Sequence, residues 1–269
     1  FLIIGTIIGV IGNLLILFLY TFGLKDAGGE RYFIPILAFM DTLGCTVSAV
    51  FYLLDNYFLF DFPSAELCQT LSLVVCFTSG SSGHLLLVIA AQRYLLICRP
   101  LGRQMTTSVR RWTVLVLFGV TFVYSLPLFM TSGIRLSKKS FLNQTVNART
   151  CVLSVKGGAE TMAYFVILFL ITISNIVGIS AFYIPVTKTI YQHMKKRNQR
   201  RQSVFNFNSV QTRQSVDAST MKSTTSGGSR QSSITDSEPA PLAKTRINLM
   251  FLAIIVVFIV SYLPSFAIL

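Results

Sequence analysis

The sequence predicts an all-α fold, a polytopic bundle of transmembrane helices. Hydrophobic residue types make up 52% of the 269 residues and charged types only 12%, which is about half the charged fraction of a typical soluble domain. The mean hydropathy is +0.64, and uncharged apolar stretches recur along the chain. A helix needs about 20 apolar residues to cross the hydrocarbon core of a bilayer. A soluble enzyme is therefore disfavoured.

Six runs are long and apolar enough to span a membrane when hydropathy is averaged over about 19 residues. They occupy residues 1–22, 32–54, 67–98, 112–130, 161–186 and 247–269. Segment 195–243 begins with a basic cluster and is then dominated by Ser, Thr, Gln and Asn. Such a composition cannot bury enough apolar surface to offset the entropy cost of ordering, so we expect a disordered loop.

The distribution of charge predicts the orientation. Alternate connections, together with Arg93 at the end of the third run, hold 18 of the 23 Lys and Arg residues. The positive-inside rule places that side in the cytoplasm and the amino terminus outside. The sequon at Asn143 falls in the second outer loop, where it could be glycosylated or remain an unused chance match. The net charge of +13 is thus explained by the basic loops on the cytoplasmic side of a membrane, and no nucleic-acid partner is expected.

Five short motifs fall in order within the runs. They are Gly12-Asn13 in the first run, Leu37-Ala38-Phe39-Met40-Asp41 in the second, Gln92-Arg93-Tyr94 in the third, Trp112 in the fourth and Tyr262-Leu263-Pro264 in the sixth. Cys68 also precedes Arg93 by 25 residues. Together these features resemble the rhodopsin-like (class A) G-protein-coupled receptors. The resemblance covers residues 1–269 as a receptor core with six of the seven helices, so we expect a core fragment that lacks the seventh helix.

The resemblance implies a disulfide and a sodium site. In the family the positions of Cys68 and Cys151 are bridged on the outer side, where disulfides persist. Asp41 corresponds to the carboxylate that holds a sodium ion, Ser82 to a hydroxyl that shares the site and Asn13 to an amide that braces it. A carboxylate inside a membrane costs at least ~2.5 kcal/mol if it is unpaired. The alternative is a protonated Asp41 in a purely structural network, and no metal other than sodium is expected.

The residues that the resemblance implies in activation and G-protein coupling lie on the third, fifth and sixth helices. They are Gln92, Arg93, Tyr94, Tyr191, Phe258 and Pro264. Gln92 stands where the family carries an acid beside the arginine, and Lys244 stands where a second acid often pairs with it. Tyr191 follows Pro185 by six residues, whereas eight is usual in the family. The alternative for Arg93 is a side chain that snorkels to the membrane surface.

The resemblance also implies a ligand pocket formed by Val75, Cys76, Ser79, Tyr262 and Phe266. Val75 replaces the acid that binds the amine in monoamine receptors, so we expect no monoamine ligand. The basic second outer loop favours a peptide or an anionic small molecule, unless its charges are simply solvated. His84 is expected to be a packed residue.

We therefore predict a plasma-membrane receptor that binds an extracellular ligand, expected to be a neuropeptide, and transmits the signal to heterotrimeric G proteins. Arrestin, receptor kinases and the lipid bilayer are the other expected partners. No convergent nucleophile, base or metal set is seen, so no catalysis is expected. A membrane transporter or channel subunit is the alternative, for which only Asp41 fits.

Overall fold

The computed structural model describes residues 2–23, 31–141, 144–155 and 157–218. Its elements are α1 (Leu2–Phe18), a π-helical turn η1 (Leu19–Gly23), α2 (Phe33–Tyr57), α3 (Ala65–Cys98), α4 (Thr107–Thr131), β1 (Gly133–Phe141), β2 (Gln144–Val152) and α5 (Ala159–Ala218). The chain divides into two compact units, residues 1–182 and residues 183–269.

Five of the described helices are long and apolar enough to cross a membrane. This confirms the predicted transmembrane helical bundle, while the sixth predicted span, 247–269, lies outside the described residues. Exposed large side chains along the helices are mostly Ile, Leu, Val and Phe. In the Ile3–Phe22 span these exposed side chains recur every three or four residues and so lie on one face of the helix, as expected where that face meets lipid instead of water.

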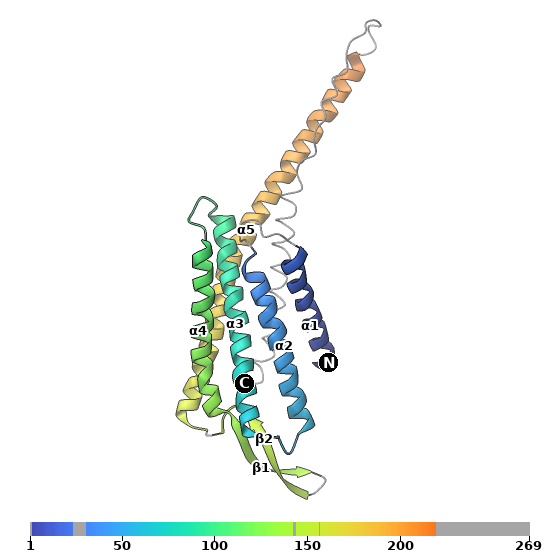
Figure 1. The fold of residues 1–269 in the computed structure, drawn as a ribbon. Helices are drawn as coiled ribbons and strands as arrows, with labels where there is room; N and C mark the ends of the chain where they lie inside the picture. Colours follow the sequence, from blue (N-terminus) through green and yellow to red (C-terminus); the bar gives the residue numbers. More distant parts are fainter. Residues whose placement is uncertain (1, 24–30, 142–143, 156, 219–269) are drawn as a thin grey trace. The chain divides into compact units, whose positions relative to one another are not determined.

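Consecutive helices pack side by side in the first unit, α1 against α2, α2 against α3 and α3 against α4 (Figure 1). Helix α3 begins where the Ser64 side chain accepts a hydrogen bond from the Leu67 N–H at 3.1 Å, and α4 begins in the same way at Thr106. Helix α3 ends just before Pro100, a residue that disfavours a helical predecessor. Local polar caps therefore set where these helices begin.

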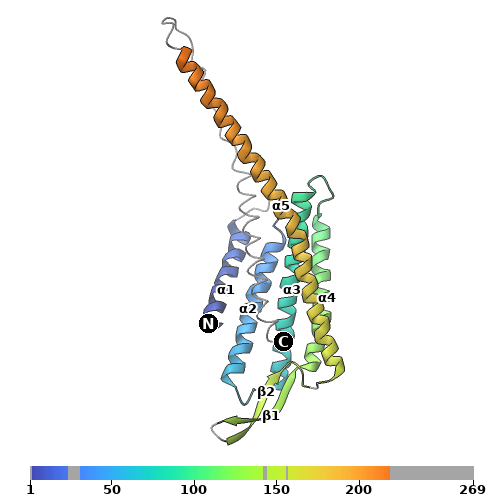
Figure 2. The ribbon, with the colours of Figure 1, turned by 180° about the vertical axis from the view of Figure 1, so that it is seen from behind.

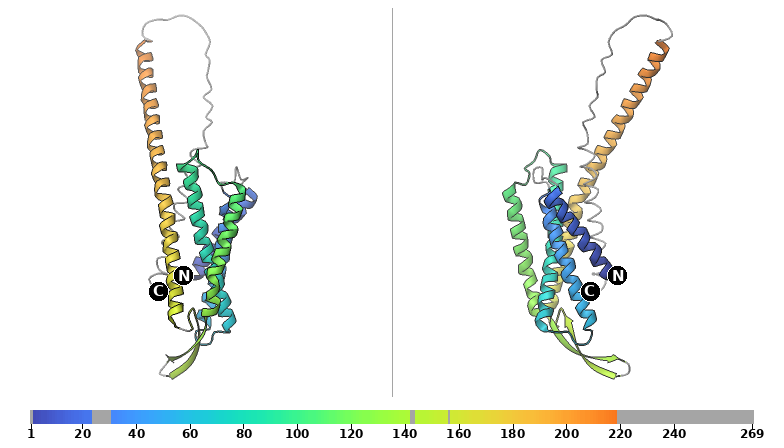
Figure 3. Two further views of the ribbon diagram at one scale, coloured as in Figure 1. Left: turned by 90° about the vertical axis from the view of Figure 1, so that its left-hand side faces the viewer. Right: turned by 45° about the vertical axis from the view of Figure 1, so that its right-hand side comes forward.

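A β-hairpin covers one end of this bundle (Figure 3). Strands β1 and β2 pair antiparallel from Gly133↔Val152 to Phe141↔Gln144. The edge of β2 also pairs with the α2–α3 connection, because the Phe62 N–H donates to the Arg149 carbonyl at 2.9 Å and the Arg149 N–H donates to the Phe60 carbonyl at 2.8 Å. Phe62 is completely buried. From the sequence, the hairpin residues are expected only to form a loop.

Helix α5 differs from expectation in its length. It continues to Ala218, so residues 195–218 have a helical backbone where disorder was expected, and the rest of segment 195–243 lies outside the described residues. Lys, Arg and Gln, which are frequent in this part, are rarely buried but have high helix propensity. A helix that has already been nucleated in the membrane can extend through them at low cost.

Candidate functional site

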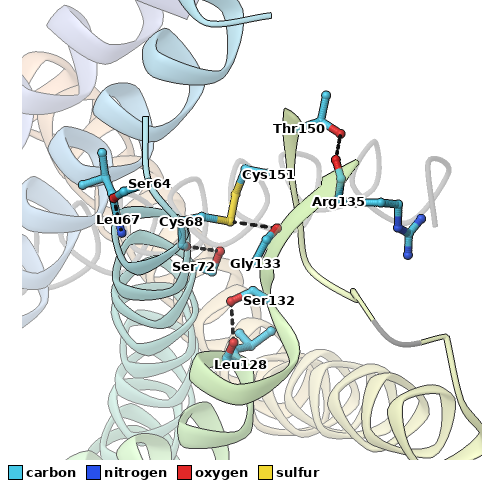
Figure 4. Close-up of a disulfide and its surroundings, with 10 residues drawn as sticks. All are labelled: Ser64, Leu67, Cys68, Ser72, Leu128, Ser132, Gly133, Arg135, Thr150 and Cys151. Carbon is cyan, nitrogen blue, oxygen red and sulfur yellow. Dashed lines mark hydrogen bonds between the residues drawn. A yellow bond between two sulfur atoms is a disulfide. The ribbon is translucent and has the colours of Figure 1, made fainter. Parts of the chain in front are cut away.

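The hairpin is bonded covalently to the start of α3. Cys68 lies one turn after the helix cap and is completely buried. Its sulfur is bonded to Cys151 of β2, 83 residues away in sequence, with 5.7 Å between the two Cα atoms. The Cys68 sulfur lies 3.4 Å from the Gly133 carbonyl oxygen (Figure 4). This is a packing contact, because a disulfide sulfur has no proton to donate. The disulfide expected from the resemblance is confirmed.

Two of the basic residues of the hairpin already interact with other groups of the chain. Arg149 forms an exposed ion pair with Asp61 at 3.3 Å, and the Arg135 guanidinium donates to the Ser154 carbonyl. Lys138 is exposed, whereas Lys156, the Lys139 side chain and the sequon at Asn143 lie outside the described residues. The positive charge offered to a ligand is therefore smaller than a count of basic residues indicates.

A cavity of about 720 Å³ lies beneath the hairpin. The ends of α3 and α4, strand β1 and the start of α5 form it, and its polar lining includes Gln69, Thr131, Ser132 and Glu160. Such a volume lies within the range of small-molecule sites. It was not predicted, because residues from four separate segments meet there and no local sequence pattern marks them.

The predicted pocket residues of α3 do not line this cavity. Val75, Cys76 and Ser79 are half-buried, and the Ser125 hydroxyl of α4 lies 3.6 Å from the Cys76 sulfur. Their expected partners on the sixth helix, Tyr262 and Phe266, lie outside the described residues. The structure therefore places three of the five predicted pocket residues.

The residues of the expected sodium site lie on three neighbouring helices. The Ser82 side chain hydrogen-bonds to the Asp41 carboxyl group, and Ser82 is buried. Carboxylate and hydroxyl oxygens are the ligands that hard cations prefer, so this pair fits a sodium ion. Asn13 instead donates its side-chain N–H to the Gly9 carbonyl of its own helix at 3.0 Å.

A second polar layer joins α3 to α4 and α5. His84 Nδ1 lies 2.6 Å from the Gly80 carbonyl, which can only accept, so Nδ1 carries a proton. In the neutral ring Nε2 is then the acceptor for the Asn175 side-chain N–H at 3.4 Å. The His84 ring also packs against Tyr124, with 5.8 Å between centroids. The expectation that His84 is a packed residue agrees with this geometry, but its partners could not be read from sequence spacing.

The predicted coupling residues of α3 lie at the end opposite the hairpin. Gln92 and Arg93 are buried, with exposed fractions of 4% and 7%, which disfavours the snorkelling alternative for Arg93. The Tyr94 ring packs against Phe182, with 5.7 Å between centroids. Tyr191 lies in the second unit of the chain, and Lys244, Phe258 and Pro264 lie outside the described residues.

Comparisons with known proteins agree with this architecture. The 7 transmembrane receptor (rhodopsin family) model matches residues 12–269. The neuropeptide Y receptor type 4 of Rattus norvegicus is 28% identical over 130 residues, which cover 47% of this chain and 34% of the relative. The receptor of the same name from Mus musculus is 30% identical over 132 residues, 48% of this chain and 34% of the relative. The matches thus span about a third of each relative's length.

The family match covers nearly the whole chain, and the described helices and the Cys68–Cys151 disulfide agree with it. The chain belongs to the rhodopsin family of seven-transmembrane receptors.

Proposed function

We propose that this receptor binds an extracellular peptide and transmits the signal to heterotrimeric G proteins from the plasma membrane. The observation that carries the proposal is the disulfide between Cys68 and Cys151, which fixes the hairpin over the cavity at one end of the bundle. We place that end outside the cell, in keeping with the charge distribution and with the oxidising compartment that a disulfide needs.

The ligand is proposed from two features. Relatives of this chain are named as neuropeptide Y receptors, and Val75 offers no carboxylate to a monoamine. Peptides of the neuropeptide Y group are therefore the first ligands to test. The hairpin would act as a fixed wall for such a peptide, since a tethered loop loses less entropy when it binds.

The signalling side is proposed at the opposite end of α3. Arg93 would contact the G protein once a ligand shifts the bundle toward the active state, because a ligand changes a conformational equilibrium only through its different affinities for the two states. Tyr191, Phe258 and Pro264 are proposed to take part in this change. Receptor kinases and arrestin would act on the Ser-rich residues 203–237, which begin within the last part of α5 and continue past its end.

We also propose that Asp41 and Ser82 hold a sodium ion, with Asn13 beside them. A sodium ion would favour whichever state keeps the carboxylate and the hydroxyl together. Removal of sodium from the medium should then change agonist affinity in the wild type and leave Asp41→Asn unaffected. An equal sodium response in the two proteins would argue for the purely structural network.

The test of the main proposal is a peptide panel applied to cells that express the full-length receptor, with calcium and cyclic-AMP readouts. We expect a response that Arg93→Ala abolishes while labelled peptide still binds. Val75→Trp should instead weaken peptide binding, and the exposed α4 substitution Leu115→Phe should change neither property. Surface-expressed receptor that activates no G protein with any peptide would contradict the proposal.

A further inference from the structure

Two clefts meet along the outer edge of α4 and α5. The cavity beneath the hairpin shares Met130, Thr131, Glu160 and Thr161 with a second cleft of about 550 Å³. Helix α4 and the first turns of α5 line the second cleft, and in Figure 2 α5 crosses in front of α4. The shared residues make the two clefts one continuous depression, which we call the α4–α5 groove.

One wall of the groove is apolar. It consists of side chains from the last turns of α4, namely Val123, Leu126, Pro127, Phe129 and Met130. Since α4 lies in a spanning segment, this wall borders the hydrocarbon of the bilayer. From Val123 to Thr131 a helix rises about 12 Å. The groove can therefore accept a stretch of alkyl chain that runs along the helix.

The hairpin end of the groove carries a negative charge. Glu160 lies in the first turn of α5 and is exposed, and among the described residues that line either cleft it is the only charged one. Its carboxylate forms no ion pair with the part of the chain that the structure describes, where the pair recorded is Arg149 with Asp61. Glu160 thus offers an acceptor for a cation at the boundary of the membrane.

Further down the groove, the backbone offers a second acceptor. Pro127 has no N–H, so the carbonyl of Val123, four residues earlier, lacks its usual helical donor. Next to this carbonyl, the Tyr164 hydroxyl donates to the Tyr124 carbonyl at 2.9 Å, which ties α5 to α4. The groove is therefore open toward the hairpin and bounded at its inner end.

We propose that the α4–α5 groove binds a single-chain cationic amphiphile from the surrounding leaflet, with its ammonium group on Glu160 and its alkyl chain along the α4 wall. The arrangement matches the way an amphiphile lies in a bilayer, since the charge sits at the boundary and the chain extends into hydrocarbon. The groove adjoins the cavity beneath the hairpin, where the peptide is proposed to bind, but binding of an amphiphile is measured by itself and does not depend on the peptide.

The probe is a dodecylamine that carries a photoreactive diazirine in its chain. It is added to the full-length receptor in phosphatidylcholine nanodiscs, and the crosslinked peptides are mapped. We expect labelling of residues 123–131 and 160–164. Glu160→Gln should reduce this labelling about fivefold, the upper range for a partly solvated ion pair.

The chain offers a matched control. Glu66 is also an exposed acid in the first turn of a spanning helix, and Glu66→Gln should leave the labelling unchanged. Dodecanol with the same diazirine should label wild type and Glu160→Gln equally. Leu126→Trp, which fills the apolar wall, should reduce labelling by both probes. Equal amine labelling of wild type and Glu160→Gln, in proteins of equal thermal stability, would overturn the proposal, as would labelling spread evenly over all the helices.

Discussion

Gly80 allows α3 and α4 to approach closely, and its replacement by Ala should destabilise the bundle. A Cβ atom at this position would overlap the Tyr124 hydroxyl oxygen and would lie 3.1 Å from Thr121 Cγ2 and 3.2 Å from Tyr124 Cζ. Thr121 is completely buried, so it has little room to move. The close approach requires a residue without a side chain.

The magnitude follows from two opposing terms. In an unobstructed helix interior, Gly→Ala stabilises by about 0.8–1.0 kcal/mol through backbone entropy and helix propensity. Overpacking a well-filled site costs about 1–3 kcal/mol. The contact below 3 Å places Gly80→Ala toward the upper part of that range, so we expect a net loss of about 1–2 kcal/mol.

Thermal unfolding of the detergent-purified receptor measures this difference. A thiol-reactive fluorogenic maleimide reports unfolding, because Cys45 and Cys76 are half-buried and lie outside the disulfide. Gly119→Ala on α4 is the matched control, since a Cβ there meets no atom within 4 Å, and it should melt at or above the wild-type temperature. Adding Tyr124→Phe to Gly80→Ala removes the overlapping hydroxyl and should restore part of the loss. The reasoning would be refuted by a Gly80→Ala protein as stable as Gly119→Ala.

Three other changes test separate parts of the molecule. Cys68→Ser and Cys151→Ser should each lower the free energy of unfolding by about 2–4 kcal/mol and weaken ligand binding. The double variant should be as stable as either single variant, because all three lack the same disulfide. An additive loss of stability would mean that the two sulfurs act separately. A double-mutant cycle of His84→Phe and Asn175→Leu, followed by thermal unfolding, should give a coupling energy of about 0.6 kcal/mol, and zero coupling would contradict the hydrogen bond. Replacing each Ser and Thr of residues 203–237 by Ala should reduce agonist-induced arrestin recruitment, because phosphates there would each add a charge of about −1.5 to −2; unchanged recruitment would make the segment a simple linker.

Hydropathy predicted the spanning helices because it depends only on length and composition. The structure begins α3 at Ala65 and α4 at Thr107, two and five residues before the apolar runs that were predicted from residues 67 and 112. Ser64 and Thr106 explain the difference, since each caps a helix before its apolar part starts. The disulfide was predicted through the family resemblance, as spacing alone does not pair two cysteines.

The contacts between helices could not be predicted in this way. Hydropathy gives the length of a helix but not its rotation, so it could not show that His84 faces Asn175 or that Gly80 faces Tyr124. The hairpin did leave a signal, because Ile134 and Leu136 alternate with polar residues as in a half-buried strand. The helical extension to Ala218 was missed because a composition test for disorder ignores the helix propensity of Lys, Arg and Gln.

The burial of Gln92 and Arg93 makes the resting state of the receptor testable. With exposed fractions of 4% and 7%, the two side chains lie where charged hydrogen bonds are stronger than in water. A family receptor holds its arginine with a neighbouring acid, and Gln92 can offer Arg93 only a neutral group. If the missing charge is worth about 1.4 kcal/mol, the active fraction without ligand is about tenfold higher.

We therefore expect measurable ligand-free signalling that Gln92→Glu suppresses about tenfold. Gln92→Met is the control, because it has a similar size without charge and should leave signalling unsuppressed. The measurement is basal G-protein activation in cells at matched surface expression. Equal basal activity in wild type and Gln92→Glu would mean that other contacts hold Arg93 in the resting state. Suppression by Gln92→Met as well would assign the effect to packing, because only the glutamate adds a charge that can pair with the arginine.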